Sequence, residues 1–398
     1  MAQSIKIFTQ TIDDASKNQL RTMIESPAFE NAKIRVMPDV HAGKGSVVGL
    51  TVANHKHIIP AVIGVDIGCG VLAYDIGFGP IDLDRLESVI RKHIPHGHAV
   101  RDRETDFPNL RRIRVYTQLK DTSRILKGLG TLGGGNHFIE VGERADGRKY
   151  LIVHSGSRNL GHQIATIYQN KAIAYHARNT AEQDELIARY KAEGRQNEIS
   201  DALFELSKQK PFIPHDLAYL SDEDKENYLH DMNIAQQYAQ ANRKQILDTI
   251  VSEMSQSRSL AKQMFVYDTI ESVHNYYDFS DGVIRKGAIS AHQGERVIIP
   301  LNMRDGCILG VGKGNSDWNN SAPHGAGRLM SRTEAKKKLK VEDFKSSMRH
   351  IYSTTVNENT IDESPKAYKS TIDIIELIRP TVDMKQIIYP IYNFKSDT

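Results

Sequence analysis

Cysteine and tryptophan are scarce in this chain, whose 398 residues include two cysteines, Cys69 and Cys307, and one tryptophan. Two thiols cannot form a disulfide framework, so we expect both to be reduced and the protein to be cytoplasmic. No apolar run approaches the roughly 18 residues of a membrane span. The first residues also lack the basic-then-apolar pattern of a signal peptide. The sequence therefore predicts a soluble protein with no membrane partner.

An excess of charge of one sign is also missing. The chain has 52 Lys and Arg residues against 49 Asp and Glu, a formal net charge of +3. This balance does not indicate nucleic-acid binding by itself, although a local basic groove is compatible with a neutral average. The apolar fraction of 39% and the charged fraction of 25% are those of an ordinary globular protein. The length alone fits either one large domain or two.

The distribution of glycine divides the chain into three zones. Residues 33–163 and 282–327 alternate short β-rich runs with glycine turns, whereas Gly194 is the only glycine between His162 and His274. In that middle zone the spacing of apolar residues predicts amphipathic helices. We therefore predict an α+β fold with a β-rich core, glycine-rich loops and a helical insertion at roughly 164–270. The expected strands lie at 34–37, 47–52, 58–65, 71–74, 150–153, 297–299 and 307–311, and helical patterns follow from 331.

An acid and a thiol three residues apart, Asp66 and Cys69, stand in the glycine-rich turn 64–70. This turn follows the apolar run 58–65, and a packed core has no reason to place such a pair there. Carboxylate and thiolate are both metal ligands. The alternative interpretation is a buried thiol that packs as a small hydrophobe beside a turn-capping aspartate.

Three histidines stand close to such polar or glycine-rich segments. His137 follows three glycines and Asn136 in the run 133–140, and the glycines permit close approach of the backbone to a ligand. His154 ends an apolar run and precedes Ser-Gly-Ser-Arg at 155–158, which fits either an anion cradle or a serine-capped helix. His274, at the end of the helical zone, would by itself be a surface histidine. Together with Asp66 and Cys69, these residues offer enough ligands for two ions that share the thiolate. They suit zinc, cobalt or manganese better than magnesium.

A fourth histidine, His324, is held between Pro323 and Gly325 in the small-residue segment 321–328. A histidine in this setting could act as a general base, a phosphate-binding group or a covalent nucleophile. Basic residues near all these loops fit either a polyanionic substrate or ion pairs with acids. They are Lys44, Arg158, Arg285, Lys286, Arg304, Lys313, Arg328 and Arg332.

In chain order these segments resemble the RtcB family of GTP-dependent RNA ligases, which join a 3′-phosphate or 2′,3′-cyclic-phosphate end to a 5′-hydroxyl end. The resemblance covers most of the chain outside the helical stretch. It implies an RtcB-like fold in which residues 1–398 form one catalytic domain. The matching segments are 37–45, 64–70, 130–140, 154–158, 274–275, 285–288, 321–328 and 363–369.

The resemblance also implies a role for each candidate residue. His324 matches the histidine that attacks GTP and carries GMP as a phosphoramidate. The ligands of two Mn²⁺ ions, with the thiolate as the bridge, would be Asp66, Cys69, His137, His154 and His274. The guanylate would be held by Asn136, His137, Phe138, Ile139, Glu140, His274, Asn275, Pro300, Leu301, Asn302, Met303, Cys307, His324, Gly325, Ala326, Gly327 and Lys395.

Three departures from the family pattern fall in the guanylate set. Residues 300–303 read Pro-Leu-Asn-Met instead of Pro-Gly-Ser-Met, Cys307 replaces a serine, and Lys395 is the candidate for the family's C-terminal lysine. The resemblance implies RNA as the partner, in tRNA splicing or in the repair of damaged RNA, and a monomer is our working expectation. Two alternatives use the same ligands without a covalent guanylate, namely a dimetal phosphodiesterase and an RNA-end-binding protein.

Overall fold

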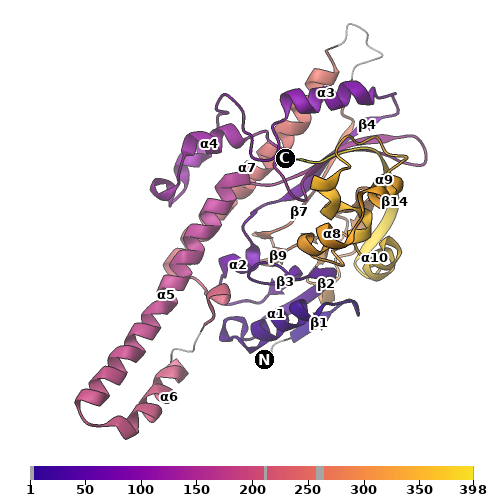
Figure 1. Ribbon diagram of the computed structural model, residues 1–398. Helices are drawn as coiled ribbons and strands as arrows, with labels where there is room; N and C mark the ends of the chain where they lie inside the picture. The colour runs from indigo at the N-terminus through magenta and orange to yellow at the C-terminus, as the bar shows by residue number, and fades with distance from the viewer. Residues whose placement is uncertain (1–3, 210–212, 257–263, 398) are drawn as a thin grey trace.

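The computed structural model describes residues 4–209, 213–256 and 264–397. The fold is α+β, as predicted, and a seven-stranded antiparallel sheet forms its centre (Figure 1). The order of the strands is β11-β12-β14-β5-β6-β4-β7, so segments that lie far apart in the chain become neighbours. The strands are β4 (Gly70–Gly77), β5 (Phe138–Glu143), β6 (Lys149–Ser155), β7 (Asp268–Val273), β11 (Arg296–Asn302), β12 (Gly306–Gly312) and β14 (Val382–Phe394).

Two smaller sheets complete the β structure. A five-stranded sheet has the order β1-β2-β3-β9-β8, in which β1 and β2 are parallel and the other neighbours antiparallel. Strands β10 and β13 form a separate pair. The strands are β1 (Ser4–Ile7), β2 (Lys33–His41), β3 (Val48–Ala53), β8 (Tyr276–Tyr277), β9 (Ile284–Lys286), β10 (Ala288–Ser290) and β13 (Ser321–Pro323).

Long helices fill the middle of the chain, as expected, but the boundaries differ from the expected 164–270. Helix α5 (Arg158–Ala192) begins directly after β6, and α7 (Asp222–Met254) is followed by strand β7. The Ser157 side chain makes no capping bond, so the serine cap considered for this helix is not formed. In Figure 1 the outer part of α5, with α6 (Ile199–Gln209) beside it, projects from the body as an arm.

The inner part of α7 packs against the central sheet at β4 and β6. Its apolar positions recur every four to eight residues, at Ile234, Tyr238, Ile246, Ile250 and Met254, and all five are buried. Ile246 and its neighbours share one core cluster with apolar side chains of β4, β5 and β6. Each fully buried aliphatic side chain contributes about 1.5–3 kcal/mol relative to exposure. This packing holds the sheet in place under the site.

Two local expectations were wrong. The apolar run at 58–65 forms the short helix α2 (Pro60–Ile63) instead of a strand, because Pro60 starts a helical turn and Gly64, with φ of 101°, ends it. The helical tail does contain helices, but it also supplies the interior strand β14. Pro390 lies in this strand, next to an irregularity in its pairing, and proline normally argues against an interior strand.

The remaining helices are short or lie at the periphery. None of the described helices is long and apolar enough to cross a membrane. The α-helices are α1 (Asp14–Glu25), α3 (Leu83–His93), α4 (Thr122–Gly128), α8 (Arg332–Lys338), α9 (Val341–Ser347) and α10 (Thr371–Ile378). The 3₁₀ turns are η1 (Pro27–Phe29), η2 (Pro108–Arg112), η3 (Tyr116–Gln118), η4 (Gln196–Glu198), η5 (His215–Leu217), η7 (Ser316–Trp318), η8 (Glu358–Glu363) and η9 (Pro365–Ala367).

Candidate metal and nucleotide site

One edge of the central sheet gathers the predicted metal ligands. Strands β5, β6, β4 and β7 are consecutive and antiparallel, so the starts of β4 and β5 meet the ends of β6 and β7. Cys69 precedes β4, His137 precedes β5, His154 is near the end of β6 and His274 follows β7. The topology therefore brings together four residues that are up to 205 positions apart in the chain.

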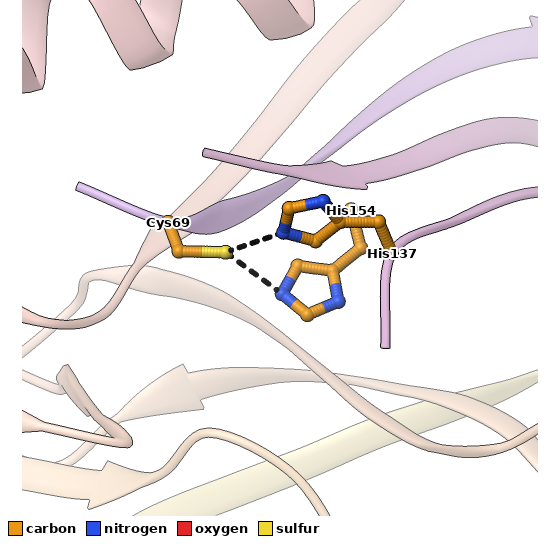
Figure 2. Close-up of side chains that lie close together, drawn as sticks. All are labelled: Cys69, His137 and His154. Atoms are coloured by element: carbon orange, nitrogen blue, oxygen red, sulfur yellow. Dashed lines mark hydrogen bonds between the residues drawn. The ribbon is translucent and has the colours of Figure 1, made fainter. Parts of the chain in front are cut away.

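The donor atoms of these residues touch one another. Cys69 Sγ lies 3.3 Å from His137 Nε2 and 3.2 Å from His154 Nε2 (Figure 2). On one side, His137 Nε2 is 3.1 Å from Asp66 Oδ2, and on the other, His154 Nε2 is 3.2 Å from His274 Nε2. Cys69, His137 and His154 thus form a close group of three donors, which Asp66 extends on the His137 side and His274 on the His154 side.

A backbone carbonyl sets the tautomer of His154. Its Nδ1 lies 3.2 Å from the carbonyl oxygen of Asn136, which can only accept, so Nδ1 carries the hydrogen and the lone pair of Nε2 faces the thiol. His137 Nδ1 lies 2.9 Å from the carbonyl oxygen of Leu132 and 3.2 Å from Arg158 Nη1. Burial lowers the pKa of all three histidines, including His274, which keeps the rings neutral and able to bind a metal.

The acid and the thiol of the cluster are both buried polar groups. Burial would raise the pKa of Asp66, but the contact with His137, the nearby Arg158 guanidinium and the contact with Cys69 outweigh it and bring the pKa well below its usual range. Asp66 Oδ1 is buried without a hydrogen-bond partner in the described chain. Burial, and then Asp66, raises the pKa of the Cys69 thiol, so the thiolate needs a bound cation to form. The residues therefore fit the binding of a transition metal, with Cys69, His137 and His154 as the closest donors.

His324 is fixed by a buried carboxylate that we did not single out from the sequence. Its Nδ1 lies 2.6 Å from Asp39 Oδ2, and its backbone N–H donates to the same oxygen at 3.2 Å. Asp39 is completely buried. The ring of His324 packs edge-on against His274 with centroids 4.7 Å apart, so it borders the metal ligands. With Nδ1–H directed at the carboxylate, Nε2 is left as the nucleophilic nitrogen.

A cavity of about 870 Å³ joins the metal cluster to the predicted guanylate residues. Of that set, the following line its wall: Asn136, Phe138, Glu140, His274, Asn275, Pro300, Leu301, Asn302, Met303, Cys307, His324, Gly325, Ala326, Gly327 and Lys395. His137 lies behind the wall and contributes its Nε2 to the cluster.

Ile139, a further member of the predicted set, does not line this wall either. Alternate residues of a strand face opposite sides, so Phe138 and Glu140 of β5 face the cavity and Ile139 does not. Ile139 is completely buried in the core cluster that packs under α7. A match of sequence segments alone does not separate the two faces of a strand.

Glu140 forms one corner of the cavity together with residues of β12 and β14. Asn393 is opposite Glu140 in the pairing of β14 with β5, and its Nδ2 donates to Glu140 Oε2 at 2.9 Å. The Cys307 thiol lies 3.7 Å from Oε1. Burial raises the pKa of Glu140 to about 7. Asn393 was not predicted as a site residue, because strand β14 itself was not predicted.

Lys395 closes the same corner through a buried ion-pair network. Its Nζ lies 2.7 Å from Glu363 Oε2 and 3.2 Å from the carbonyl oxygen of Asn136. Glu363 also pairs with Arg332 at 2.6 Å and with Arg328 at 3.3 Å. Burial would raise the pKa of Glu363, but these three cations hold it well below its usual range.

Ion pairing explains much of the basic set noted in the sequence. Four of its members pair with carboxylates, namely Arg285, Arg304, Arg328 and Arg332. Lys286 Nζ instead donates to the carbonyls of Lys44, Ser46 and Ala61 at 2.6–3.1 Å, which holds two loops of the cavity wall together. The Lys44 side chain is exposed at the cavity and has no ion pair in the described residues.

The fold and this donor set define an α+β protein with a candidate dinuclear metal centre beside a nucleotide-sized cavity. A family model described as "tRNA-splicing ligase RtcB" matches residues 19–120 and 109–396. The chain belongs to the RtcB family, which confirms the resemblance seen in the sequence.

Named relatives match over nearly the whole chain. The chain is 31% identical to the RNA-splicing ligase RtcB of Escherichia coli (strain K12), over 97% of this chain and 95% of that protein. It is 26% identical to the tRNA-splicing ligase RtcB of Nanoarchaeum equitans, over 96% of this chain and 90% of the relative. For the tRNA-splicing ligase RtcB of Archaeoglobus fulgidus the identity is 24%, over 93% and 88%.

Proposed function

We propose that the protein is an RNA ligase that joins RNA 3′-phosphate or 2′,3′-cyclic-phosphate ends to 5′-hydroxyl ends, in tRNA splicing or RNA repair. Membership of a family described as a tRNA-splicing ligase supports ligase activity. The observation that carries the finer proposal is the Asp39–His324 pair. His324 lines the cavity next to the metal ligands, and the buried Asp39 behind it leaves one ring nitrogen available for covalent catalysis.

In the first step, His324 Nε2 attacks the α-phosphorus of GTP. A nitrogen–phosphorus bond forms, the bond to pyrophosphate breaks, and pyrophosphate leaves. Asp39 keeps the proton on Nδ1 and stabilises the positive charge that develops on the ring. The guanine would lie at the corner formed by Glu140, Asn393 and Lys395.

In the next steps, an oxygen of the RNA 3′-phosphate attacks the same phosphorus, and His324 leaves and is regenerated. The RNA end is now capped with GMP, which is a good leaving group on an otherwise poor electrophile. The RNA 5′-hydroxyl then attacks the 3′-phosphorus, a phosphodiester bond forms, and GMP departs. A cyclic phosphate must first be hydrolysed to the 3′-phosphate.

The same proposal includes metal binding, and the resemblance implies that the metal is two Mn²⁺ ions. Bound ions would neutralise the charges of the phosphates and orient the attacking hydroxyl. Their ligands would be Asp66, Cys69, His137, His154 and His274, whose donor atoms already converge. We also propose that the chain is one catalytic unit, because strands from both sides of the helical arm share the central sheet.

A covalent guanylate separates this proposal from a dimetal phosphodiesterase or an RNA-end-binding protein. Purified protein incubated with manganese and labelled GTP should form an acid-labile, alkali-stable adduct, as expected of a histidine phosphoramidate. The adduct should vanish in His324→Ala and persist in Lys92→Ala, which changes an exposed residue of α3. If the wild-type chain forms no adduct with any nucleotide, the ligase proposal is wrong and the phosphodiesterase is favoured.

A further inference from the structure

The positive charge of the chain is concentrated in one short segment near its end. Residues 331–350 contain seven Lys and Arg against three Asp and Glu, a formal charge of +4, whereas the whole chain carries +3. This segment forms helices α8 and α9, which lie on the body away from the projecting arm (Figure 1). The even balance of the whole chain therefore hides a local basic surface.

Part of this charge is not neutralised by neighbouring acids. Arg332 pairs with Asp362 and Glu363, and Lys338 pairs with Glu334. Four further cations are exposed and have no ion pair within the described chain, and we call them the α8–α9 surface. They are Lys337, Lys340, Lys345 and Arg349.

The α8–α9 surface starts where the cavity opens. The first turn of α8 and the residues before it line the cavity, among them Leu329, Ser331 and Arg332, and Leu329 is 54% exposed. Helix α8 packs on η8, which carries Glu363 and so connects to Lys395 at the nucleotide corner. The surface is thus fixed to the guanylate side of the cavity, where an RNA 3′ end would be capped.

The chemistry of the surface fits a phosphate backbone. Its apolar residues, Phe344 and Met348, are buried in their own core cluster, so they offer no anchor for a protein partner. Flexible exposed lysines contact phosphates as point charges and do not require a particular base.

We propose that the α8–α9 surface binds the backbone of single-stranded RNA next to the 3′-phosphate that enters the cavity. This inference rests on the proposed function and adds to it a path for the strand that is to be capped. Each lost phosphate contact should reduce the dependence of binding on salt, because fewer counterions are released.

The test uses Lys337→Gln, Lys340→Gln and Lys345→Gln in one full-length variant. A matched control carries Lys92→Gln, Lys120→Gln and Lys191→Gln, three exposed lysines elsewhere that also lack ion pairs in the described chain. Binding of a fluorescent single-stranded RNA with a 3′-phosphate is measured over a range of salt concentrations. In the first variant we expect weaker binding, on the order of tenfold, and a log–log salt slope smaller by up to about 2. The control should keep the wild-type affinity and slope.

The same variants separate this inference from the proposed function. Guanylate adduct formation without RNA should be equal in the wild type and both variants, because that step does not involve the α8–α9 surface. In ligation, the KM for the 3′-phosphate RNA should rise in the first variant, with kcat at saturating RNA unchanged. Equal RNA affinity and salt slope in all three proteins would overturn the inference alone. A wild-type chain that binds no RNA would overturn both proposals.

Discussion

The two ends of the cavity differ in how their polar groups are satisfied. At the metal end, donor atoms of Asp66, Cys69 and three histidines face one another, and Asp66 Oδ1 is buried with no hydrogen-bond partner among the described residues. At the nucleotide corner, charged groups already have partners, since Glu363 binds Lys395 and two arginines, and Glu140 accepts from Asn393.

From this difference we expect amino-acid substitutions at the two ends to affect function in different ways. At the metal end the donors converge on one another, so the loss of one donor removes a ligand from a small set. The nucleotide corner is assembled in advance, and an incoming base must exchange hydrogen bonds with it. Substitutions at the metal end should therefore act in an all-or-none way, and those at the nucleotide corner should be graded.

The shared thiol should give the largest effect. Cys69→Ala should remove manganese and ligation activity together, with ligation falling below detection, because losing a ligand costs more than the roughly 10–100-fold seen when only an outer-shell partner is removed. Metal content by elemental analysis and ligation of RNA ends are the measurements. Cys307→Ser is the matched thiol control and should keep its metal. Full manganese content in Cys69→Ala would show that the thiol is not a bridge.

Asp39 should give the next largest effect and should leave the metal in place. In Asp39→Asn the amide can donate to Nδ1 of His324, which moves the ring hydrogen to Nε2 and blocks the nucleophile. We expect the rate of adduct formation to fall about a thousandfold, while elemental analysis finds unchanged manganese. If the adduct forms at the wild-type rate, the carboxylate does not set the tautomer.

Glu140→Gln should change stability and function in opposite directions. The pKa of Glu140 is raised from 4.5 to about 7 in the fold, so its contribution to stability is present below pH 4.5 and is lost as the pH rises to about 7. Glutamine does not ionise, so this pH-dependent destabilisation is absent. The free energy of unfolding above pH 7 should therefore rise by up to about 3 kcal/mol, with little change below pH 4.5.

Thermal unfolding across this pH range measures the effect, and the KM for GTP in adduct formation should rise. A stability difference that is the same at every pH would show that burial does not raise the pKa of Glu140. A stabilised variant with weaker nucleotide binding is the pattern expected where a strained group serves function.

Asn393→Ala should give the smallest effect, a graded loss at the nucleotide corner. It removes a hydrogen bond to a carboxylate that is worth about 1.5–3 kcal/mol, so the KM for GTP should rise on the order of tenfold. Manganese content should not change. The matched control is Asn359→Ala, an exposed asparagine of η8 outside the cavity wall. Loss of metal in Asn393→Ala would contradict the separation of the two ends.

The residues of the metal end could be predicted from the sequence because each stands in an unusual local pattern. Cysteine and histidine next to glycines at the ends of apolar runs are unusual, and the resemblance grouped them correctly. The pairs Asp39–His324 and Glu140–Asn393 were not accessible, since each joins residues more than 250 positions apart and only Glu140–Asn393 lies across a strand pair, with the unpredicted strand β14. The misplacement of Ile139 has the same origin, because a segment match does not say which face of β5 is inward.

Strand β14 has a consequence for how the protein is made. It lies in the interior of the central sheet, between β12 and β5, although it is near the end of the chain. During synthesis the earlier strands emerge first, and β5 and β12 keep unpaired edges until Val382–Phe394 has left the ribosome. A nascent or truncated chain would therefore expose two unpaired strand edges, which can pair with another chain, and would lack both Asn393 and Lys395. Completion of the sheet and completion of the corner that holds Asn393 and Lys395 are therefore one event.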